Sequence, residues 1–393
     1  TLPAQSRNYT TTAAITPRPL QITPDAGVQI VYGDDEMPEF TYTAQNLATG
    51  DTLDLITGAL SSTVRLYDGT EGSADGVGAY AITAGTLNAG ANYITTVLEE
   101  TLTVLPKPLT VRAEDVTTIY GTPVNLGGTT ATADGLINGD SVTTVTGQFT
   151  YNGNTYGSVI GTANAGTYTN SVTASQARGT GLQNYDITYE TSNVVIDKAA
   201  LTVEVVDDAR FQIQSDASGY QGVVATGWKN GDDLSDLGGN LTIARNNAGV
   251  NEPGRYEQVL QGSGLTSNNY DITYESGDYT IVSSGVILKT GRSETTYGQA
   301  PVYTLTAQYS DGSTVFGDLD VAQNADTITV TGVPGSSLSM RLAAEDAALS
   351  VSTSGNLRAG GYQLAVEPGS LTVTGDTIAE VTVAGALDVK AKP

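Results

Sequence analysis

Short stretches in which hydrophobic and polar residues alternate run along most of the chain. In NYDITYE, at residues 184–190, the two tyrosines and the isoleucine share one face of an extended strand, whereas aspartate and threonine share the other. Side chains of a strand point alternately to opposite faces, so this pattern predicts a strand of an antiparallel sheet with one buried face. The same seven residues return at 269–275, which is 85 residues later.

Further motifs recur in a fixed order, which indicates a tandem array. Each repeat opens with a strand-like segment, followed by Tyr-Gly, Gly-Asp, Gly-x-Tyr and Asn-Tyr. The aligned apolar residues of the opening segments lie 89, 92 and 85 residues apart, at Leu20, Leu109, Leu201 and Val286. Tyr-Gly occurs at Tyr32-Gly33, Tyr120-Gly121 and Tyr297-Gly298, and Gly-Asp occurs at Gly50-Asp51, Gly139-Asp140, Gly231-Asp232 and Gly317-Asp318. Gly-x-Tyr occurs at Gly78/Tyr80, Gly166/Tyr168 and Gly254/Tyr256, and Asn-Tyr occurs at Asn92-Tyr93, Asn184-Tyr185 and Asn269-Tyr270. The third repeat has ARFQIQSD where Tyr-Gly is expected.

These positions predict the domain organisation. It comprises the tail of a preceding repeat (1–16), a first repeat (17–104), a second (105–196), a third (197–281), a divergent fourth (282–373) and the start of a following repeat or a linker (374–393). The tail is inferred from RNYTTTAAIT at 7–16, and the following repeat from VAGALDVKAKP at 383–393. The fourth repeat diverges because its Tyr362 lies 106 residues after Tyr256 rather than 88, and because LAAEDAALSV at 342–351 has no counterpart.

The predicted fold is all-β, a tandem array of small antiparallel modules that are sandwich-like or β-grasp-like. Runs of Thr, Val and Tyr broken by Gly, Asn and Asp are typical of strands and tight turns. An aspartate can cap a helical turn, so we expect one such turn after each Gly-Asp, with Leu53 and Ile56, or Leu234 and Leu237, facing the core. Prolines stiffen the junctions at positions 17, 19, 106 and 108, which predicts an elongated rod.

Composition excludes several classes of function. The 393 residues include 42 acidic and 17 basic ones, for a net charge of −25, and no basic cluster suits nucleic acid or an anionic membrane. There is no Cys and no His, which excludes thiolate metal sites and Ser-His-Asp or Cys-His catalysis within the chain. No apolar run approaches the ~18 residues of a membrane helix. Because the chain begins at Thr1 without a signal-like segment, we interpret it as part of a longer polypeptide.

The order of motifs resembles a known family. Gly-Asp, Ala-Gly-Thr-Tyr (165–168), Asn-Tyr-Asp-Ile-Thr-Tyr, Lys-Ala-x-Leu-Thr-Val (198–203) and Tyr-Gly are similar to MBG-type (mostly-β, glycine-rich) repeats of large secreted bacterial adhesins. These include filamentous-haemagglutinin-like proteins of two-partner secretion and biofilm adhesins. The resemblance covers nearly the whole chain and is clearest over 105–281. It implies an extracellular, non-enzymatic stalk that projects an adhesive region from the cell surface, with other parts of the same adhesin as partners. It supplies no catalytic or cofactor-binding residues.

Calcium is the most attractive chemistry for so acidic a chain. Hard oxygen ligands occur at Asp34-Asp35-Glu36, at Asp207-Asp208, at Asp232-Asp233, and along Asp318, Asp320, Asn324 and Asp326. None of these clusters has the spacing of a helix–loop–helix calcium site or of a calcium-binding nonapeptide repeat. The pattern therefore favours solvated turns, and we predict no metal ligand, although structural calcium remains an alternative.

The alternative function is a module in which the third or fourth repeat binds surface glycan, matrix polysaccharide or protein. The only tryptophan, Trp228, is its best candidate contact, since aromatic rings stack on sugars. The structural interpretation is favoured for Trp228, for the recurring tyrosines and for Gly-Asp, as core residues and turns. A glycosidase needs only two carboxylates, but no pair stands out. The recurring lysines Lys107 and Lys198 lie at junctions, which argues against buried Lys–Asn cross-links.

Overall fold

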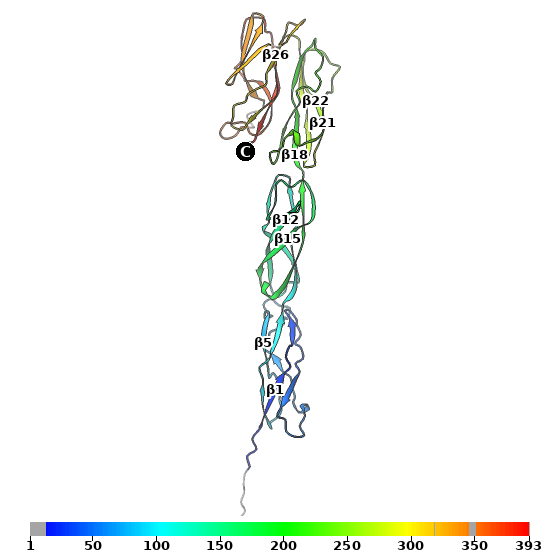
Figure 1. Cartoon of the computed structure of the whole chain (residues 1–393), viewed down its shortest axis with the longest axis vertical. Helices are drawn as coiled ribbons and strands as arrows, with labels where there is room; N and C mark the ends of the chain where they lie inside the picture. Colours follow the sequence, from blue (N-terminus) through cyan, green and yellow to red (C-terminus); the bar gives the residue numbers. More distant parts are fainter. Residues whose placement is uncertain (1–12, 318, 346–350, 393) are drawn as a thin grey trace, which may run out of the picture. The chain divides into compact units, whose positions relative to one another are not determined.

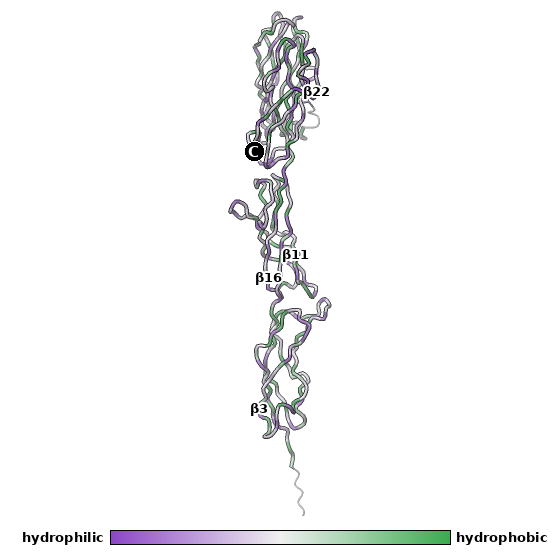
Figure 2. The backbone as a smooth tube through the Cα atoms, turned by 90° about the vertical axis from the view of Figure 1, so that its right-hand side faces the viewer, coloured by the Kyte–Doolittle hydropathy of each residue, from purple (hydrophilic) through white to green (hydrophobic). Residues whose placement is uncertain are grey.

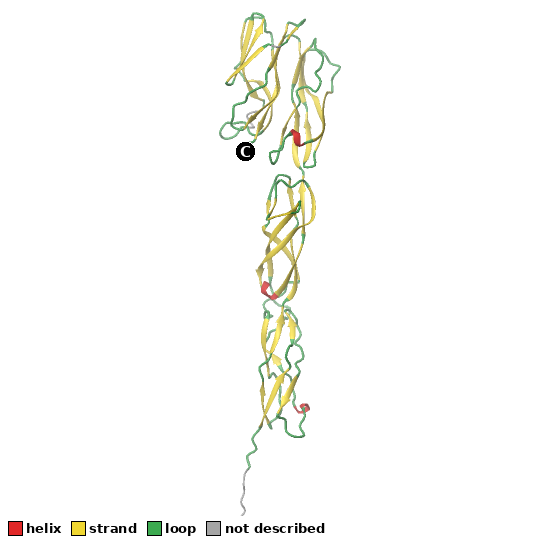
Figure 3. Ribbon diagram, in the orientation of Figure 1, coloured by secondary structure: helices red, strands yellow, loops and turns green. Residues whose placement is uncertain are grey.

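The computed structural model describes residues 13–317, 319–345 and 351–392. These residues form strands joined by turns, with three short 3-10 turns (Figure 3). The chain divides into two compact units, Thr1–Val116 with Asn125–Val159 and Tyr168–Val194, and Thr117–Val124 with Ile160–Thr167 and Val195–Pro393. The boundary between the units therefore crosses the second repeat.

The first repeat forms two small sheets. Its strands are β1 (Arg18–Pro24), β2 (Gln29–Val31), β3 (Tyr42–Gln45), β4 (Ser61–Ser62), β5 (Gly78–Thr83), β6 (Tyr93–Val97) and β7 (Thr101–Leu105). One sheet has the order β3-β1-β6 and the other β2-β7-β5-β4. Figure 1 labels one strand of each, β1 and β5. Strand β1 is parallel to β6 and β2 is parallel to β7. The sheets are thus mixed rather than purely antiparallel, because the first two strands of the repeat pair with its last two.

The second repeat spans both units. Its strands are β8 (Lys107–Ala113), β9 (Val116–Ile119), β10 (Val124–Asn125), β11 (Gly127–Asp134), β12 (Ser141–Tyr151), β13 (Asn154–Tyr156), β14 (Ser158–Val159), β15 (Gly166–Thr180), β16 (Tyr185–Glu190) and β17 (Ser192–Asp197). In the first unit, β8 lies between β16 and β11, and β11 continues to β12. Strand β8 is again parallel to the Asn-Tyr strand, β16.

The third repeat has the arrangement of the first. Its strands are β18 (Ala199–Val205), β19 (Asp208–Phe211), β20 (Val223–Thr226), β21 (Gly238–Arg245), β22 (Gly254–Thr266), β23 (Tyr270–Glu275) and β24 (Gly277–Val282). Its sheets have the orders β20-β18-β23 and β19-β24-β22-β21, with β18 parallel to β23 and β19 parallel to β24. The two copies of NYDITYE therefore occupy equivalent places, as strands that pair with the opening strand of their own repeat.

The fourth repeat forms one larger sheet. Its strands are β25 (Gly285–Thr296), β26 (Thr306–Ser310), β27 (Val315–Phe316), β28 (Asp320–Asn324), β29 (Thr327–Val333), β30 (Ser336–Ala344), β31 (Gly360–Val366), β32 (Thr372–Thr374) and β33 (Val381–Lys390). The path runs β27-β26-β25-β33-β31-β30-β29-β28. Strands β25 and β33 are parallel over ten paired positions, from Val286 to Thr296 and Val381 to Lys390. In the first and third repeats, two successive strands occupy the place of β25, and two further successive strands occupy the place of β33.

Residues 374–393 differ from the expectation of a following repeat or a linker. Their strand β33 pairs with both β25 and β31, and it is buried from Ala384 to Val389. The segment therefore completes the fourth repeat, which extends to Lys390. Its sequence resembles that of an opening strand because the first and the last strands of these repeats are both rich in apolar residues. The predicted tail at 1–16 lies largely outside the described residues, as do Asp318 and part of 342–351.

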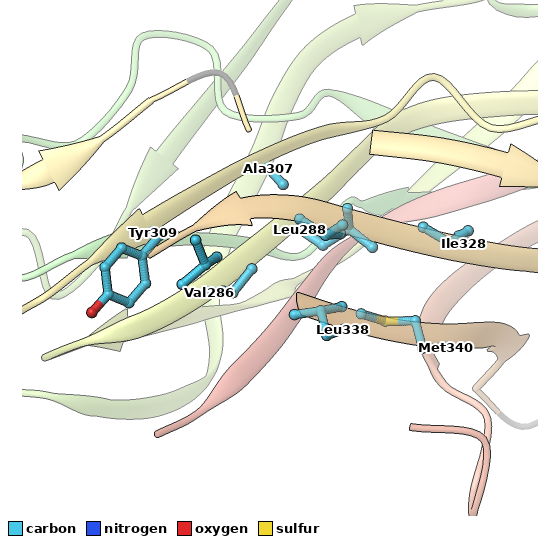
Figure 4. Close-up of a cluster of buried hydrophobic side chains, with 9 residues drawn as sticks. Val286, Leu288, Ala307, Tyr309, Ile328, Leu338 and Met340 are labelled. Atoms are coloured by element: carbon cyan, nitrogen blue, oxygen red, sulfur yellow. The ribbon is translucent and has the colours of Figure 1, made fainter. Parts of the chain in front are cut away.

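The cores consist mostly of residues that the alternating patterns place inward. On the predicted inward face of NYDITYE, Tyr185 is buried but Tyr189 is 38% exposed. The four aligned residues that open the repeats are at most 1% exposed, namely Leu20, Leu109, Leu201 and Val286. Hydrophobic and hydrophilic residues are interspersed along the described chain (Figure 2). In the fourth repeat, Val286 and Leu288 of β25 pack with Tyr309 of β26 and Met340 of β30 (Figure 4). Burial of such side chains stabilises a fold by about 1.5–3 kcal/mol each.

The helical turns follow Gly-Asp in two repeats. Leu53–Leu55 and Leu234–Asp236 are 3-10 turns, and Asp233 caps the second by accepting from the Ser235 amide at 2.7 Å. In the second repeat, Gly139-Asp140 leads directly into β12, whose β-branched Val and Thr residues favour a strand. The prediction for Leu53 is wrong, because its side chain is 45% exposed and only Ile56 is buried.

Candidate functional site

Three of the recurring motifs meet where one repeat contacts the next. The Tyr-Gly tyrosine of one repeat lies against the Gly-Asp aspartate and the Asn-Tyr tyrosine of the following repeat. We call this cluster a tyrosine joint. The first joint connects repeats 1 and 2 within the first unit, and the second joint connects repeats 2 and 3 within the second unit.

In the first joint, one carboxylate oxygen accepts two phenolic hydrogen bonds. Tyr32 donates to Asp140 Oδ2 at 2.8 Å, and Tyr185 donates to the same oxygen at 3.0 Å. The two rings meet edge to face, with centroids 5.5 Å apart and planes at 85°. Asn138 Nδ2 donates to the Tyr32 hydroxyl at 2.9 Å, and the Ile137 amide donates to the Tyr185 hydroxyl at 3.0 Å. Each phenol therefore both donates and accepts.

The second joint repeats this geometry. Tyr120 and Tyr270 donate to Asp232 Oδ2 at 2.9 and 2.7 Å, and their rings lie 5.4 Å apart at 83°. The Lys229 amide donates to the Tyr270 hydroxyl at 2.9 Å, as the Ile137 amide does to that of Tyr185. Hydrogen bonds to a charged group contribute about 1.5–3 kcal/mol. Each joint thus contains two strong bonds to one carboxylate in addition to the aromatic contact.

The asparagine of Asn-Tyr adds a second crossing to each joint. Asn184 Oδ1 accepts the Val77 amide of the first repeat at 3.0 Å. Asn269 Oδ1 accepts the Ala165 amide of the second repeat at 3.0 Å, and its Nδ2 donates to Asn164 at 3.1 Å. Both donating amides, those of Val77 and Ala165, lie immediately before a Gly-x-Tyr motif. Four recurring motifs therefore converge on each joint.

The Asn-Gly-Asp sequence explains how the aspartate is presented. Asn138 and Gly139 have φ of 58° and 80°, and Asn230 and Gly231 have φ of 56° and 84°. Asn and Gly tolerate this left-handed conformation better than other residues, and two such residues in sequence form a type I′ turn. The Asp140 amide closes the first turn by donating to the Ile137 carbonyl at 2.9 Å. The turn directs the asparagine and aspartate side chains toward the preceding repeat.

The glycine of Tyr-Gly permits close approach of the next repeat. Gly33 has φ of 93°, and a Cβ there would lie 2.2 Å from Cδ1 of Ile137. Gly121 has φ of 84°, and a Cβ there would lie 2.6 Å from the Cβ of Lys229. Ile137 and Lys229 occupy the same position of their repeats, immediately before Asn-Gly-Asp. The motif therefore combines a turn conformation with a steric requirement that only glycine meets.

Burial sets the protonation state of the joint tyrosines. Loss of solvent is the main cause that raises the pKa of Tyr32, Tyr120, Tyr185 and Tyr270, and the neighbouring carboxylate raises it further. An ionised phenol beside a carboxylate would be unfavourable, so the tyrosines remain neutral hydrogen-bond donors. The joints are chemically suited to hold two repeats together and offer no activated nucleophile or base.

The third repeat keeps the turn but lacks the joint. Gln212 occupies the place of the missing tyrosine, since its amide donates to the Val282 carbonyl at 2.9 Å as the Tyr32 amide does to that of Leu105. Ile213 occupies the place of the glycine and is 49% exposed. The fourth repeat instead packs beside the third within the second unit. The shared apolar clusters consist of Ala209, Phe211, Val282, Ile287 and Ala384, and of Val206, Val224 and Ala386.

Polar contacts complete this different interface. Lys289 Nζ lies 2.6 Å from Oδ1 of Asp208, a carboxylate that is almost fully buried. The Gln363 side chain donates through Nε2 to the Val205 carbonyl at 2.9 Å, and its Oε1 accepts from the backbone amide of Asp207 at 3.0 Å. The missing Tyr-Gly of the third repeat therefore coincides with a change from a joint to a lateral apolar contact.

A groove of about 590 Å³ beside this contact is lined largely by carboxylates. Asp207 is one of these carboxylates, and its Oδ1 accepts the Asp278 amide at 2.6 Å. Burial is the main cause that raises the pKa of Asp207 to about 7, and Asp278 and Glu345 raise it further. Arg255 opposes them, with 2.8 Å to Asp278 but 3.9 Å to Asp207. The Arg255 guanidinium is thus shared between the carboxylates of Asp278 and Asp207, and it lies closer to Asp278.

Acidification is expected to stabilise the contact between the third and fourth repeats. A pKa raised from 3.8 to about 7 favours the protonated folded state, so stability increases as pH falls from about 8 through 7 toward 4. The gain is at most about 4 kcal/mol, since a tenfold change in equilibrium is about 1.4 kcal/mol. Thermal unfolding of the chain between pH 5 and 8 measures it. Asp207→Asn should remove most of this dependence, and an unchanged profile in that variant would contradict the assignment.

The acidic clusters for which calcium was the alternative have other partners. Asp34 Oδ2 accepts the Val31 amide at 2.9 Å, Asp232 accepts the two tyrosines, and Asp233 caps a 3-10 turn. Asp207 and Asp208 line the interface of the third and fourth repeats. Asp318 lies outside the described residues. Within the described ranges, no group of three or more acidic side chains could hold a metal ion.

Trp228 lies at the second joint. Its ring contacts Tyr270 edge to face, with centroids 5.5 Å apart at 85°. It also lines a pocket of about 350 Å³ with Asp232 and Lys390. The proposal of core packing for the recurring tyrosines fits Tyr185 and Tyr270, which are 7% and 3% exposed. What sequence reasoning missed is the partner of their hydroxyls. A signal existed, because Tyr-Gly of the first and of the second repeat is each followed one repeat later by Asn-Gly-Asp.

These features define a tandem β-repeat protein with built-in joints. A family model described as "MBG domain (YGX type)" matches residues 20–103, 109–195 and 201–280, well over half of the chain. The chain therefore belongs to the MBG domain family. Repeats of this family occur in large bacterial surface proteins, and the family is a structural repeat type rather than a known enzyme family.

Other comparisons add little. Comparison with curated proteins gives no significant match. The Bacillus anthracis TIE protein is one solved structure that aligns, over 95% of this chain and 74% of its own, with 8% identity and a TM-score of 0.18. That score is too low to support an argument about fold. In the described part of the chain, no helix is both long and apolar enough to cross a membrane.

Proposed function

We propose that this chain is a structural stalk segment of a large extracellular bacterial adhesin. The observation that carries the proposal is the pair of equivalent tyrosine joints, which repeat the same three side chains and nearly the same distances. A site that recurs between repeats fixes one repeat against the next, whereas a catalytic site is normally assembled once. The stalk would project an adhesive region for attachment or biofilm formation, with other parts of the same adhesin as its partners.

Composition and surface chemistry are consistent with this role. A net charge of −25 favours solubility and self-repulsion at a wet surface. The prolines at 106 and 108 restrict the backbone at the first joint, so that the covalent link and the noncovalent contacts act together. Export by two-partner secretion belongs to the same proposal, which rests there on family resemblance.

Removal of one repeat tests the spacer role. Deleting residues 109–200 joins Pro108 to Leu201 and brings Tyr32 opposite Asp232 and Tyr270, which are equivalent to its native partners. The shortened chain should fold, and its maximum dimension in solution scattering should fall by roughly 40 Å, the length of a ten-residue strand with its loops. An unchanged maximum dimension would contradict a spacer.

The second candidate function is ligand binding at the pocket beside Trp228. The specific observation is that the only tryptophan of the chain lines this pocket, together with Gly227, Gly231 and Gly360. An indole beside glycines leaves room for the apolar face of a pyranose ring. Surface glycan or matrix polysaccharide would be the ligand.

Intrinsic fluorescence reads this pocket directly, because all tryptophan emission comes from Trp228. A binding module predicts a saturable emission change when polysaccharide is added, and loss of surface attachment in Trp228→Ala. The stalk proposal predicts neither, and Trp228→Ala should reduce stability by about 0.5–1.5 kcal/mol through the lost contact with Tyr270 beyond the loss of buried area.

A further inference from the structure

The fourth repeat has the turn that the first two repeats use in their joints. The Tyr297 amide donates to the Lys390 carbonyl at 2.8 Å, as the Tyr32 amide does to that of Leu105 at 2.9 Å. The Gln299 amide closes the turn on the Thr296 carbonyl at 2.8 Å. Gly298 has φ of 81°, close to the 84° of Gly121. The backbone that presents Tyr297 is therefore the backbone of a joint.

The surroundings of this turn differ from those of the joints. A Cβ on Gly298 would meet nothing within 4 Å among the described residues, whereas one on Gly33 or Gly121 would meet the next repeat. The Tyr297 side chain is only half-buried, and its hydroxyl lies 3.4 Å from the Ser354 hydroxyl, at the long limit of a hydrogen bond. No described residue fills the position that Ile137 or Lys229 takes in the joints.

The first repeat carries the complementary residues. The Tyr93 hydroxyl donates to Asp51 and accepts the Ala48 amide at 2.8 Å, as Tyr185 does with Asp140 and Ile137. Asp51 is exposed, and Tyr93 is its one tyrosine donor among the described residues. Thr49 replaces the asparagine of the other turns, so one joint hydrogen bond is absent from this version.

Sequence spacing matches as well. Lys390, whose carbonyl holds Tyr297, corresponds to Leu105, and the following Ala-Lys-Pro at 391–393 corresponds to Pro-Lys-Pro at 106–108. In the first joint, Leu109 of the next repeat follows this proline directly. A repeat that began after position 393 with a residue equivalent to Leu20 would therefore stand in the register of a joint.

We propose that the Tyr297-Gly298 turn is a docking surface for the Gly-Asp and Asn-Tyr face of a further MBG-type repeat. Tyr297 would donate to the aspartate of that repeat and meet its tyrosine edge to face. The inference rests on the proposed stalk function and extends it, because it states which chemistry must meet the fourth repeat. It follows from continuity with the two joints already described.

A tandem fusion tests the proposal. A second copy that begins at Leu20 is joined after Pro393, so that its Asp51 and Tyr93 stand opposite Tyr297. The chain has no cysteine, so dyes can be placed on Ser313→Cys of the first copy and Ala26→Cys of the second, both at exposed positions. Single-molecule energy transfer should then show one narrow, docked population.

Two substitutions should remove that population, Tyr297→Phe in the first copy and Asp51→Asn in the second, and combining them should add little further loss. Tyr256→Phe is the matched control, because its hydroxyl bonds within its own repeat to the Glu252 carbonyl. If the energy-transfer distribution of the unsubstituted fusion is as broad as that of the substituted fusions, the proposal is overturned. A narrow distribution that neither substitution changes would also overturn it.

The same fusion separates this inference from the stalk proposal. A second dye pair across the first joint, combined with Tyr32→Phe, reports on the established contact with Asp140. If Tyr32→Phe broadens its distribution while Tyr297→Phe changes nothing, the docking surface is refuted and the stalk stands. If neither tyrosine matters, both proposals are refuted.

Discussion

Asp232→Ala should open the second tyrosine joint while leaving the first intact. The substitution leaves the hydroxyls of Tyr120 and Tyr270 without their common acceptor, although both tyrosines are at most 5% exposed. An unsatisfied buried polar group costs about 1–3 kcal/mol, so the expected loss for the pair is about 2–6 kcal/mol. This is the largest effect that a single side chain of the joint is expected to have.

Two backbone amides report on the joints separately. The Ala165 amide bonds to Asn269 across the second joint, and the Val77 amide bonds to Asn184 across the first. In Asp232→Ala, hydrogen exchange should accelerate at Ala165 and remain unchanged at Val77. Asp232→Asn retains an acceptor oxygen, so exchange at Ala165 in this variant should be faster than in the unchanged protein and slower than in Asp232→Ala.

Asp51→Ala is the matched control for this prediction. Asp51 is equivalent to Asp232 but accepts from one tyrosine, Tyr93, within its own repeat. Its removal should therefore leave the exchange of both reporter amides unchanged. Equal acceleration at Ala165 in the two variants would show that the aspartate supports its own repeat rather than the joint.

Gly121→Ala should loosen the second joint through steric conflict. A Cβ at this position would lie 2.6 Å from the Cβ of Lys229, which is close to the backbone of the third repeat and cannot rotate away. The left-handed conformation of Gly121 adds about 1–2 kcal/mol for any residue with a Cβ. The two effects should separate the repeats at this point and accelerate exchange at Ala165.

Gly298→Ala isolates the steric part of that effect. Gly298 has φ of 81°, so alanine there carries the same backbone cost, but its Cβ would meet nothing within 4 Å. Both variants should lose stability through the strained backbone conformation. Only Gly121→Ala should also open the joint. If thermal unfolding and exchange at Ala165 respond equally to both substitutions, the close approach of Lys229 has no role in holding the joint.

The alternating patterns and repeated motifs predicted most of the strands because each repeat buries its own small core. Leu20, Leu109 and Leu201 are placed inward by the same local pattern, and local pattern is what a sequence displays. The parallel pairing of first and last strands was not predictable, because it joins segments about 75 residues apart. For the same reason the sequence does not show that β33 pairs with β25 of its own repeat.

The joints show where sequence reasoning stopped. Within a single repeat, Tyr-Gly indicates a core residue and Gly-Asp a turn, and the first two repeats contain both. The hydrogen bond from Tyr32 to Asp140 spans 108 residues, and neither motif alone indicates it. The loss of Tyr-Gly from the third repeat was visible in the sequence, but the lateral contact that replaces the joint depends on apolar residues of β19 and β33 with no distinguishing spacing.

Small-angle X-ray scattering of the chain, in calcium and then in chelator, tests the central claim most directly. A compact globule of 393 residues should have a radius of gyration of about 21 Å. A stalk held by tyrosine joints should give a rod-like profile with a much larger radius, unchanged by chelator and less rigid in Asp232→Ala. A compact profile near the globular value would contradict the stalk, and a rod that bends only when calcium is removed would assign its stiffness to metal instead of tyrosine and aspartate.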